Sequence, residues 1–172
     1  LLLKNDIALY ASHTPTDVAD GGLNDILAEK LGIKQLEIIE KNDKYSGCGL
    51  GRIGNIPESV TAAQFCETVK KALNTPFVRL SGDPSAIIKR VAVGSGACSD
   101  LIPAAKQMGA DIMVTADMKY HIARDGVERG LCIIDAGHYP TERFAISFFA
   151  GLLENTDLEI ICSSDADIFS VL

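Results

Sequence analysis

Residues 91–135 read VAVGSGACSDLIPAAKQMGADIMVTADMKYHIARDGVERGLCIID, and this segment alternates short apolar runs with longer amphipathic ones. The short runs are bounded by glycine or polar residues, which is typical of buried strands. The longer runs have the length and apolar spacing of helices. The segment therefore predicts strands at Val91–Val93, Ile112–Thr115 and Leu131–Ile134, with one helix that ends near Met108 and another from about Tyr120 to Glu128.

The flanking sequence extends this alternation in both directions. It predicts helices at Leu23–Leu31, Ala62–Leu73 (with Thr61 or Ser59 as N-cap) and Glu142–Leu153, and extended segments at Ile7–Ser12, Leu36–Ile39, Phe77–Leu80 and Leu158–Cys162. Strands that alternate with helices of ten to fifteen residues are joined by right-handed crossovers. We therefore expect one α/β domain over residues 1–172, with a mainly parallel or mixed sheet and helices on both faces.

Composition and charge limit the kinds of partner. The chain has 172 residues, of which 47% are hydrophobic, and this is enough for a well-buried core. The net charge of −7 is spread along the sequence without basic or acidic blocks, which argues against direct nucleic-acid binding and against an anionic membrane surface. Small molecules or other protein subunits are the partners that this composition favours.

The cysteines and the lengths of the apolar runs indicate a cellular compartment. Five cysteines, an odd number, are widely spaced without any Cys-x-x-Cys pair, and most lie inside apolar runs. This pattern predicts reduced core thiols in a cytoplasmic protein. No apolar stretch reaches the roughly 18 residues that a membrane-spanning helix requires.

Two of the three histidines stand in matching contexts at the ends of predicted strands. His13 precedes Asp17 by four residues, His138 precedes Glu142 by four, and each pair encloses a proline-containing turn. Imidazole and carboxylate groups suit zinc, manganese, iron, cobalt and nickel. The alternative is that Asp17 and Glu142 only offset the dipole at the start of a helix.

Glycine-rich runs follow two of the strands. Gly94-Ser95-Gly96 joins a strand to a helix, so its N–H groups are candidates for binding a phosphate. Ordinary tight-turn geometry is the alternative, since the lysine of a P-loop and the third glycine of a dinucleotide motif are missing. The run from Gly47 to Gly54 precedes no helix directly and favours flexible or bulged strand geometry.

A dense group of polar residues follows Thr115. In Asp117-Met118-Lys119-Tyr120-His121, Lys119 is a candidate for binding phosphate, and His121 is a candidate for proton exchange near neutral pH. The alternative is a solvated helix start with Asp117 as N-cap. In a parallel sheet, sites form at the carboxyl ends of the strands, where His13, the Gly94 loop, Asp117 and His138 all fall. The sequence therefore predicts one composite site.

Five motifs together resemble one known family, the GTP cyclohydrolase I type 2 homologues, also called the NIF-three-like family. In order along the chain they are Tyr10-Ala11-Ser12-His13-Thr14-Pro15-Thr16-Asp17, Gly21-Gly22-Leu23-Asn24-Asp25, Val93-Gly94-Ser95-Gly96, Asp117-Met118-Lys119-Tyr120-His121 and Ile134-Asp135-Ala136-Gly137-His138-Tyr139-Pro140-Thr141-Glu142. The resemblance implies a dinuclear divalent-metal site, with zinc, iron or manganese among the options, in the central cavity of a toroidal homohexamer.

By motif, the resemblance implies that Asp17, His138 and Glu142 are metal ligands. It implies that His13 and the Lys119-Tyr120-His121 group line the cavity. The family supplies further ligands from an upstream pair of histidines, and this chain begins at Leu1, part-way through what resembles an amphipathic helix. We therefore expect the full protein to have a preceding segment, and the spacing from Asp17 to His138 resembles the short form without an inserted domain.

Two functions are compatible with these observations. The first is a metal-dependent hydrolase of a nucleotide or other phosphorylated small molecule. In it Asp17, His138 and Glu142 hold metal, His121 or His13 moves protons, and Lys119, Tyr120 and the Gly94-Ser95-Gly96 loop bind substrate. The second is a non-catalytic metal-binding protein that acts as a regulator or scaffold through other proteins.

Overall fold

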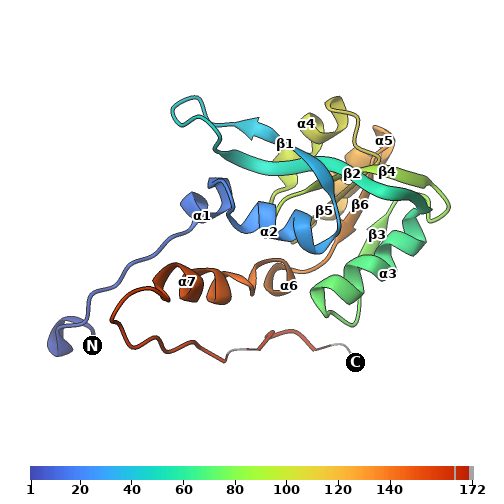
Figure 1. Ribbon diagram of the computed structural model, residues 1–172. Coiled ribbons are helices and arrows are strands. Elements are labelled where there is room, and N and C mark those ends of the chain that lie inside the picture. The colour runs from blue at the N-terminus through green and yellow to red at the C-terminus, as the bar shows by residue number, and fades with distance from the viewer. Residues whose placement is uncertain (165, 171–172) are drawn as a thin grey trace.

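The protein is built on one mixed β-sheet that carries helices on both faces (Figure 1). The computed structural model describes residues 1–164 and 166–170. In this part of the chain the sheet has six strands in the order β1-β2-β4-β5-β6-β3. The strands are β1 (Lys34–Lys41), β2 (Gly49–Thr61), β3 (Arg79–Ser81), β4 (Ile87–Val93), β5 (Ile112–Thr115) and β6 (Cys132–Asp135).

The parallel part of the sheet is smaller than the sequence predicts. Strands β4, β5 and β6 are parallel, but β1 pairs with β2, β2 with β4, and β3 with β6 in antiparallel fashion. The expectation of a mixed α/β sheet is confirmed, whereas a mainly parallel one is wrong. For β1 and β2 the reason is local, because these strands form a hairpin and no helix connects them. The glycine run 47–54 covers the end of that hairpin loop and the start of β2, where Gly51 has φ +67°.

The helices follow the predicted order. They are α1 (Thr14–Val18), α2 (Leu23–Lys30), α3 (Ala62–Leu73), α4 (Ile102–Gln107), α5 (Tyr120–Glu128), α6 (His138–Glu142) and α7 (Ala145–Leu153), with short 3-10 turns at Leu3–Asn5 and Ser99–Leu101. The N-cap predicted at Thr61 is confirmed, since its hydroxyl accepts from the N–H of Gln64, whose side chain accepts from the N–H of Thr61. This reciprocal pair satisfies two amides that the first turn of α3 leaves without partners.

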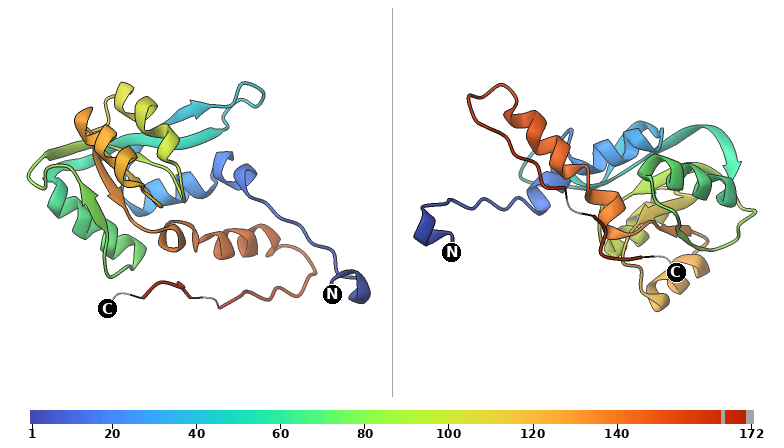
Figure 2. Two further views of the ribbon diagram at one scale, coloured as in Figure 1. Left: turned by 180° about the vertical axis from the view of Figure 1, so that it is seen from behind. Right: turned by 90° about the horizontal axis from the view of Figure 1, so that it is seen from below.

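Alternation along the three parallel strands produces two apolar layers. In β5, Ile112 and Val114 face the core under α2 and α3, while Met113 faces the core under α4 and α5. The same switch occurs in β6, where Ile134 faces the first layer and Ile133 the second. Side chains on a strand point alternately to opposite faces, so a strand apolar at every position must be covered on both sides. Figure 2 shows helices lying on each side of the sheet.

Two predicted strands do not form in the described part of the chain. Ile7–Ser12 and Leu158–Cys162 carry no regular secondary structure, and most of their residues are exposed. Figure 1 shows both segments lying away from the sheet. Both segments have the residue composition of strands, but a strand also needs a neighbouring strand with which to form backbone hydrogen bonds. As a result Cys162 is exposed. Cys48, in the β1–β2 hairpin loop, is half-buried, so the core-thiol prediction is confirmed only at Cys66, Cys98 and Cys132.

The helix predicted over Glu142–Leu153 is divided. Helix α6 begins earlier, at His138, and α7 begins at Ala145, so Glu142 is the last residue of one helix instead of the first of another. Helix α7 is apolar in sequence, yet none of its residues is buried. Across residues 1–164 and 166–170, no helix has the length and apolar character needed to cross a membrane.

Candidate metal centre

The carboxyl ends of β4, β5 and β6 bring distant parts of the chain together. The loop after β4 contains Gly96, the loop after β5 contains Asp117, and α6 starts directly after β6 with His138. Adjacent parallel strands end at the same edge of a sheet, so these three segments converge for a topological reason. The composite site predicted from the sequence thus has a structural basis at this edge.

His138 lies between two carboxylates. Its Nδ1 is 2.7 Å from Oδ2 of Asp117, and its Nε2 is 3.2 Å from Oε2 of Glu142. Asp117 is not the N-cap of α5, since the cap position is Lys119; its own backbone has φ +52°. A carboxylate on one ring nitrogen fixes the orientation of the ring and makes the other nitrogen a better ligand. The alternative of a solvated helix start therefore does not describe Asp117.

Asp17 reaches the same edge from α1. The hydroxyl of Ser95 donates to Oδ1 of Asp17 at 3.2 Å, and the side-chain amide of Asn24 donates to the backbone oxygen of Asp17 at 2.9 Å. The side-chain oxygen of Asn24 also accepts from the N–H of Ser95 at 2.9 Å. Asn24 is fully buried, so it connects α1 to the loop after β4 without water access. This connection holds Asp17 near the Gly94-Ser95-Gly96 loop.

Gly96, in the loop after β4, lies against the side chains of His138 and Glu142. A Cβ at this position would overlap Oε1 of Glu142 and would lie 3.1 Å from Nε2 of His138. Gly96 also has φ +60°, a conformation that L-residues with side chains rarely adopt. The absence of a side chain here lets Glu142 and His138 pack against the loop.

Burial perturbs the acids of this cluster. Desolvation raises the pKa of Asp17, opposed by the hydrogen bond from Ser95 and by the nearby charges of His13 and His138. Desolvation likewise raises the pKa of Glu142, where the charge of His138 acts in the opposite direction. The pKa of His138 is raised, mainly by its hydrogen bond to Asp117. Buried carboxylates beside an imidazole are stabilised when a cation neutralises them.

The donor types fit a divalent metal, but the donor number is small. Two carboxylates and one imidazole whose second nitrogen is held by a carboxylate suit zinc, iron or manganese. Within the described residues, no group of three or more His, Cys, Asp or Glu side chains is close enough together to form a metal cage. Two metal ions would require donors beyond Asp17, His138 and Glu142.

The Gly94-Ser95-Gly96 loop has little capacity left for an anion. The N–H of Gly94 donates to the Val114 carbonyl, and that of Gly96 donates to the hydroxyl of Thr141. The N–H of Ser95 is already bonded to Asn24. A phosphate cradle needs several N–H groups that point at the ligand, and these three point into the protein. The structure therefore favours the alternative of a tight turn that packs the site together.

The remaining predicted site residues lie outside this contact network. Lys119 and His121 are exposed, and Tyr120 is 82% exposed. Nowhere in the described chain does a hydrogen bond or ion pair join one of these three to Asp17, His138 or Glu142. His13 is exposed at the N-cap of α1 and acts on Asp17 and Glu142 only through its charge.

Three contributors to the site escaped the sequence reasoning. Asn24 and Thr141 lie inside recognised motifs, but only the fold reveals that they bond the loop after β4. Asp135 is buried and accepts from Arg79 and from the N–H groups of Met118 and Gly137. It thereby supports the two loops that carry Asp117 and His138. The signal available in the sequence was the position of Asp135, a polar residue at the end of the apolar run Leu131–Ile134.

The fold and the cluster together define a class, namely an α/β protein with carboxylate and imidazole groups at the carboxyl edge of its parallel strands. A family model, Duf34/NIF3 (NGG1p interacting factor 3), matches residues 1–167. The chain belongs to this family, so the resemblance inferred from the five motifs is confirmed.

Individual relatives give the same result. A GTP cyclohydrolase 1 type 2 homolog of Clostridium perfringens is 35% identical over 168 residues, which cover 96% of this chain and 64% of that protein. The crystal structure of the Staphylococcus aureus protein SA1388 has a TM-score of 0.87 at 26% identity, covering 99% of this chain and 71% of that one. Reduced HcgD from Methanocaldococcus jannaschii has a TM-score of 0.73 at 32% identity, covering 92% and 61%. The chain thus spans somewhat less than two thirds of the Clostridium relative.

Proposed function

We propose that this chain contributes to a cytoplasmic, metal-dependent hydrolase that acts on a nucleotide or another phosphorylated small molecule. The observation that supports it best is the convergence of two desolvated carboxyls, Asp17 and Glu142, near His138, whose other ring nitrogen is held by Asp117. Perturbed acids around an oriented imidazole are typical of metal and catalytic sites. Two divalent ions and a homohexameric ring, as the family resemblance implies, are part of the proposal.

Each residue has a defined task in this proposal. Asp17, His138 and Glu142 bind the metal ions, and Asp117 keeps the proton on Nδ1 of His138, so that Nε2 presents its lone pair. A bound divalent ion would supply a water of lowered pKa and would polarise the bond to be cleaved. His13, exposed beside the two acids, and His121 are the two candidates for moving a proton.

Metal content tests the metal-binding part of the proposal. Full-length protein purified without chelator should contain about two divalent ions per subunit by elemental analysis, as a dinuclear site requires. The double variant Asp17→Ala with His138→Ala should lose them. A matched control is His121→Ala with Asp125→Ala, which removes another histidine and acid four residues apart, away from the cluster. Metal-free wild-type protein, or equal loss in the control, would overturn the assignment.

The role of His121 is tested separately by turnover. If His121 exchanges protons during hydrolysis, His121→Ala should lose turnover of a phosphoester or nucleotide substrate while its fold and metal content persist. Unchanged turnover would remove His121 from the mechanism and leave His13 as the candidate. His13→Ala should then show the loss.

A regulatory or scaffold role is the second candidate, and a specific observation favours it. Helix α7 is apolar yet buries none of its residues, and Ile7, Leu9 and Ile161 are exposed as well. Exposed apolar surface of this kind commonly binds another protein. The family description itself names an interaction with NGG1p. Stable metal binding without turnover of any phosphorylated substrate would favour this role.

A further inference from the structure

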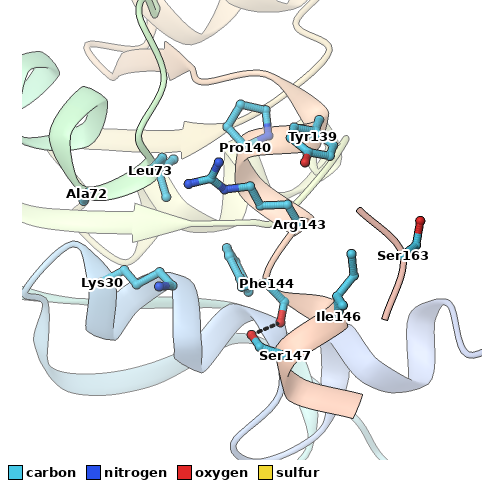
Figure 3. A pocket seen from close by; sticks show the side chains of 10 residues that line it. All are labelled: Lys30, Ala72, Leu73, Tyr139, Pro140, Arg143, Phe144, Ile146, Ser147 and Ser163. Carbon is cyan, nitrogen blue, oxygen red and sulfur yellow. Dashed lines mark hydrogen bonds between the residues drawn. The ribbon is translucent and has the colours of Figure 1, made fainter. Parts of the chain in front are cut away.

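A polar cavity lies against α6, the helix that carries His138 and Glu142. It is open to solvent on one side, has a volume of about 320 Å³ and is lined by residues of α2, α3, α6, the start of α7 and the C-terminal segment. Its volume is at the lower end of the range of roughly 300–1,000 Å³ found for small-molecule sites. Figure 3 shows the side chains that line it.

The charged side chains of this cavity are both cationic. Lys30 comes from the end of α2, and Arg143 comes from the junction of α6 and α7. In Figure 3 the two approach the cavity from opposite sides, with the ring of Phe144 between them. The ammonium of Lys30 lies 5.7 Å from the centre of that ring. The cavity thus carries two cationic side chains in a chain whose net charge is −7.

Arg143 differs from the other arginines of the protein. Four of these, Arg52, Arg79, Arg90 and Arg124, each bond a carboxylate. Arg129 is exposed at the end of α5, where water solvates it. Arg143 is half-buried, and within residues 1–164 and 166–170 no carboxylate lies at ion-pair distance from its guanidinium. A partly desolvated guanidinium without a counter-charge is stabilised when an anion binds.

From these observations we propose that the Lys30–Arg143 cavity binds the phosphate of inorganic phosphate or of a small phosphomonoester. The planar guanidinium of Arg143 donates two parallel hydrogen bonds to phosphate oxygens, and Lys30 adds a compact positive charge. The hydroxyl of Ser147 already donates to the Phe144 carbonyl at 2.9 Å, so the two cations supply the binding. The apolar surface of Pro140 and Phe144 accommodates the carbon skeleton of an ester.

Phosphate binding in the Lys30–Arg143 cavity depends on these two side chains and does not require a bound metal ion. A neighbouring cavity of about 340 Å³ has His138, Glu142, Arg143 and Asp167 among its lining residues, so Arg143 borders both spaces. A phosphate held by Arg143 would therefore lie beside the proposed metal centre. If the hydrolase proposal holds, this is where the phosphate of its substrate binds, in place of the Gly94-Ser95-Gly96 loop.

Phosphate titration in the presence of chelator tests the site apart from the metal centre. Inorganic phosphate is titrated into full-length protein with calorimetric detection, and the dissociation constants of Arg143→Gln, Lys30→Gln and the control Arg129→Gln are compared. A charge-assisted hydrogen bond contributes about 1.5–3 kcal/mol, so each cavity variant should bind roughly tenfold more weakly or worse. The control, which removes an exposed arginine with the same change in charge, should bind as the wild type does.

Folding is kept separate from binding by three additional measurements. Circular dichroism establishes that each variant is folded, and Arg143→Lys retains the charge but loses the planar fork, so its affinity should be intermediate. Phosphate should also raise the melting temperature of wild-type protein but not that of Arg143→Gln, since a ligand stabilises the state that binds it. The proposal is wrong if wild-type protein shows no saturable binding, or if folded Arg143→Gln binds phosphate as tightly. Either result would mean that Lys30 only complements the end of α2 and that Arg143 only covers apolar surface.

Discussion

Asn24 offers the sharpest test of how the candidate site is held together. Its fully buried side chain donates to the Asp17 carbonyl and accepts from the Ser95 N–H, each at 2.9 Å. In Asn24→Ala both hydrogen bonds disappear, at about 1 kcal/mol each, and the buried N–H of Ser95 loses its partner at a further cost of up to about 2 kcal/mol. We therefore expect the free energy of unfolding to fall by about 2–4 kcal/mol. If water enters the vacated space, the free energy of unfolding should fall by only about 2 kcal/mol, the lower end of this range.

The matched control is Asn42→Ala. The side-chain oxygen of Asn42 also accepts two backbone N–H bonds, from Lys44 and Tyr45 at 2.9 and 3.0 Å, but in an exposed loop where water replaces it. Its loss should stay below about 1 kcal/mol. The chain has no tryptophan, so urea unfolding is followed by far-UV circular dichroism and extrapolated linearly. Equal destabilisation by the two substitutions would refute the idea that Asn24 holds Asp17 to the loop after β4.

Further predictions concern the site itself. Gly96→Ala should displace the Glu142 carboxylate and lower metal content, whereas Gly47→Ala, which has φ +82° but open space, should cost only about 1–2 kcal/mol of backbone strain and leave metal content unchanged. In metal-free protein, Asp117→Asn should lower the pKa of His138 toward its usual value near 6.5 in an NMR titration, and an unmoved pKa would contradict the role of that hydrogen bond. Because the folded pKa of His138 is raised, its stabilising contribution is complete below the usual pKa and is lost as pH rises through the raised one. Burial raises the pKa values of the site carboxyls in metal-free protein, and their protonation competes with metal binding, so metal content should fall on acidification, as metal analysis at stepwise lower pH would detect.

Elements whose signals are local were predictable from the sequence. The strand Ile112–Thr115 and the helix Tyr120–Glu128 have the predicted bounds, and Thr61 caps α3 as its sequence indicates. Apolar runs, helical spacing and caps act over a few residues, so one sequence can carry them. The strand predicted at Ile7–Ser12 is wrong because a strand also needs a neighbouring strand for its backbone hydrogen bonds, and the described part of the chain places none beside this segment.

The sequence by itself determined the α/β class, because the alternation of short apolar runs with amphipathic ones is a local pattern. It also determined the family and the residue types of the candidate site, because five short motifs carry them. Only the tertiary structure decided which of those residues meet. It brings Asp17, Glu142 and His138 to one edge, leaves Lys119 and His121 exposed, and directs the N–H groups of the glycine loop into the protein. The physical reason is that contacts between loops after separate strands depend on strand order and register, and no local pattern of residues encodes these.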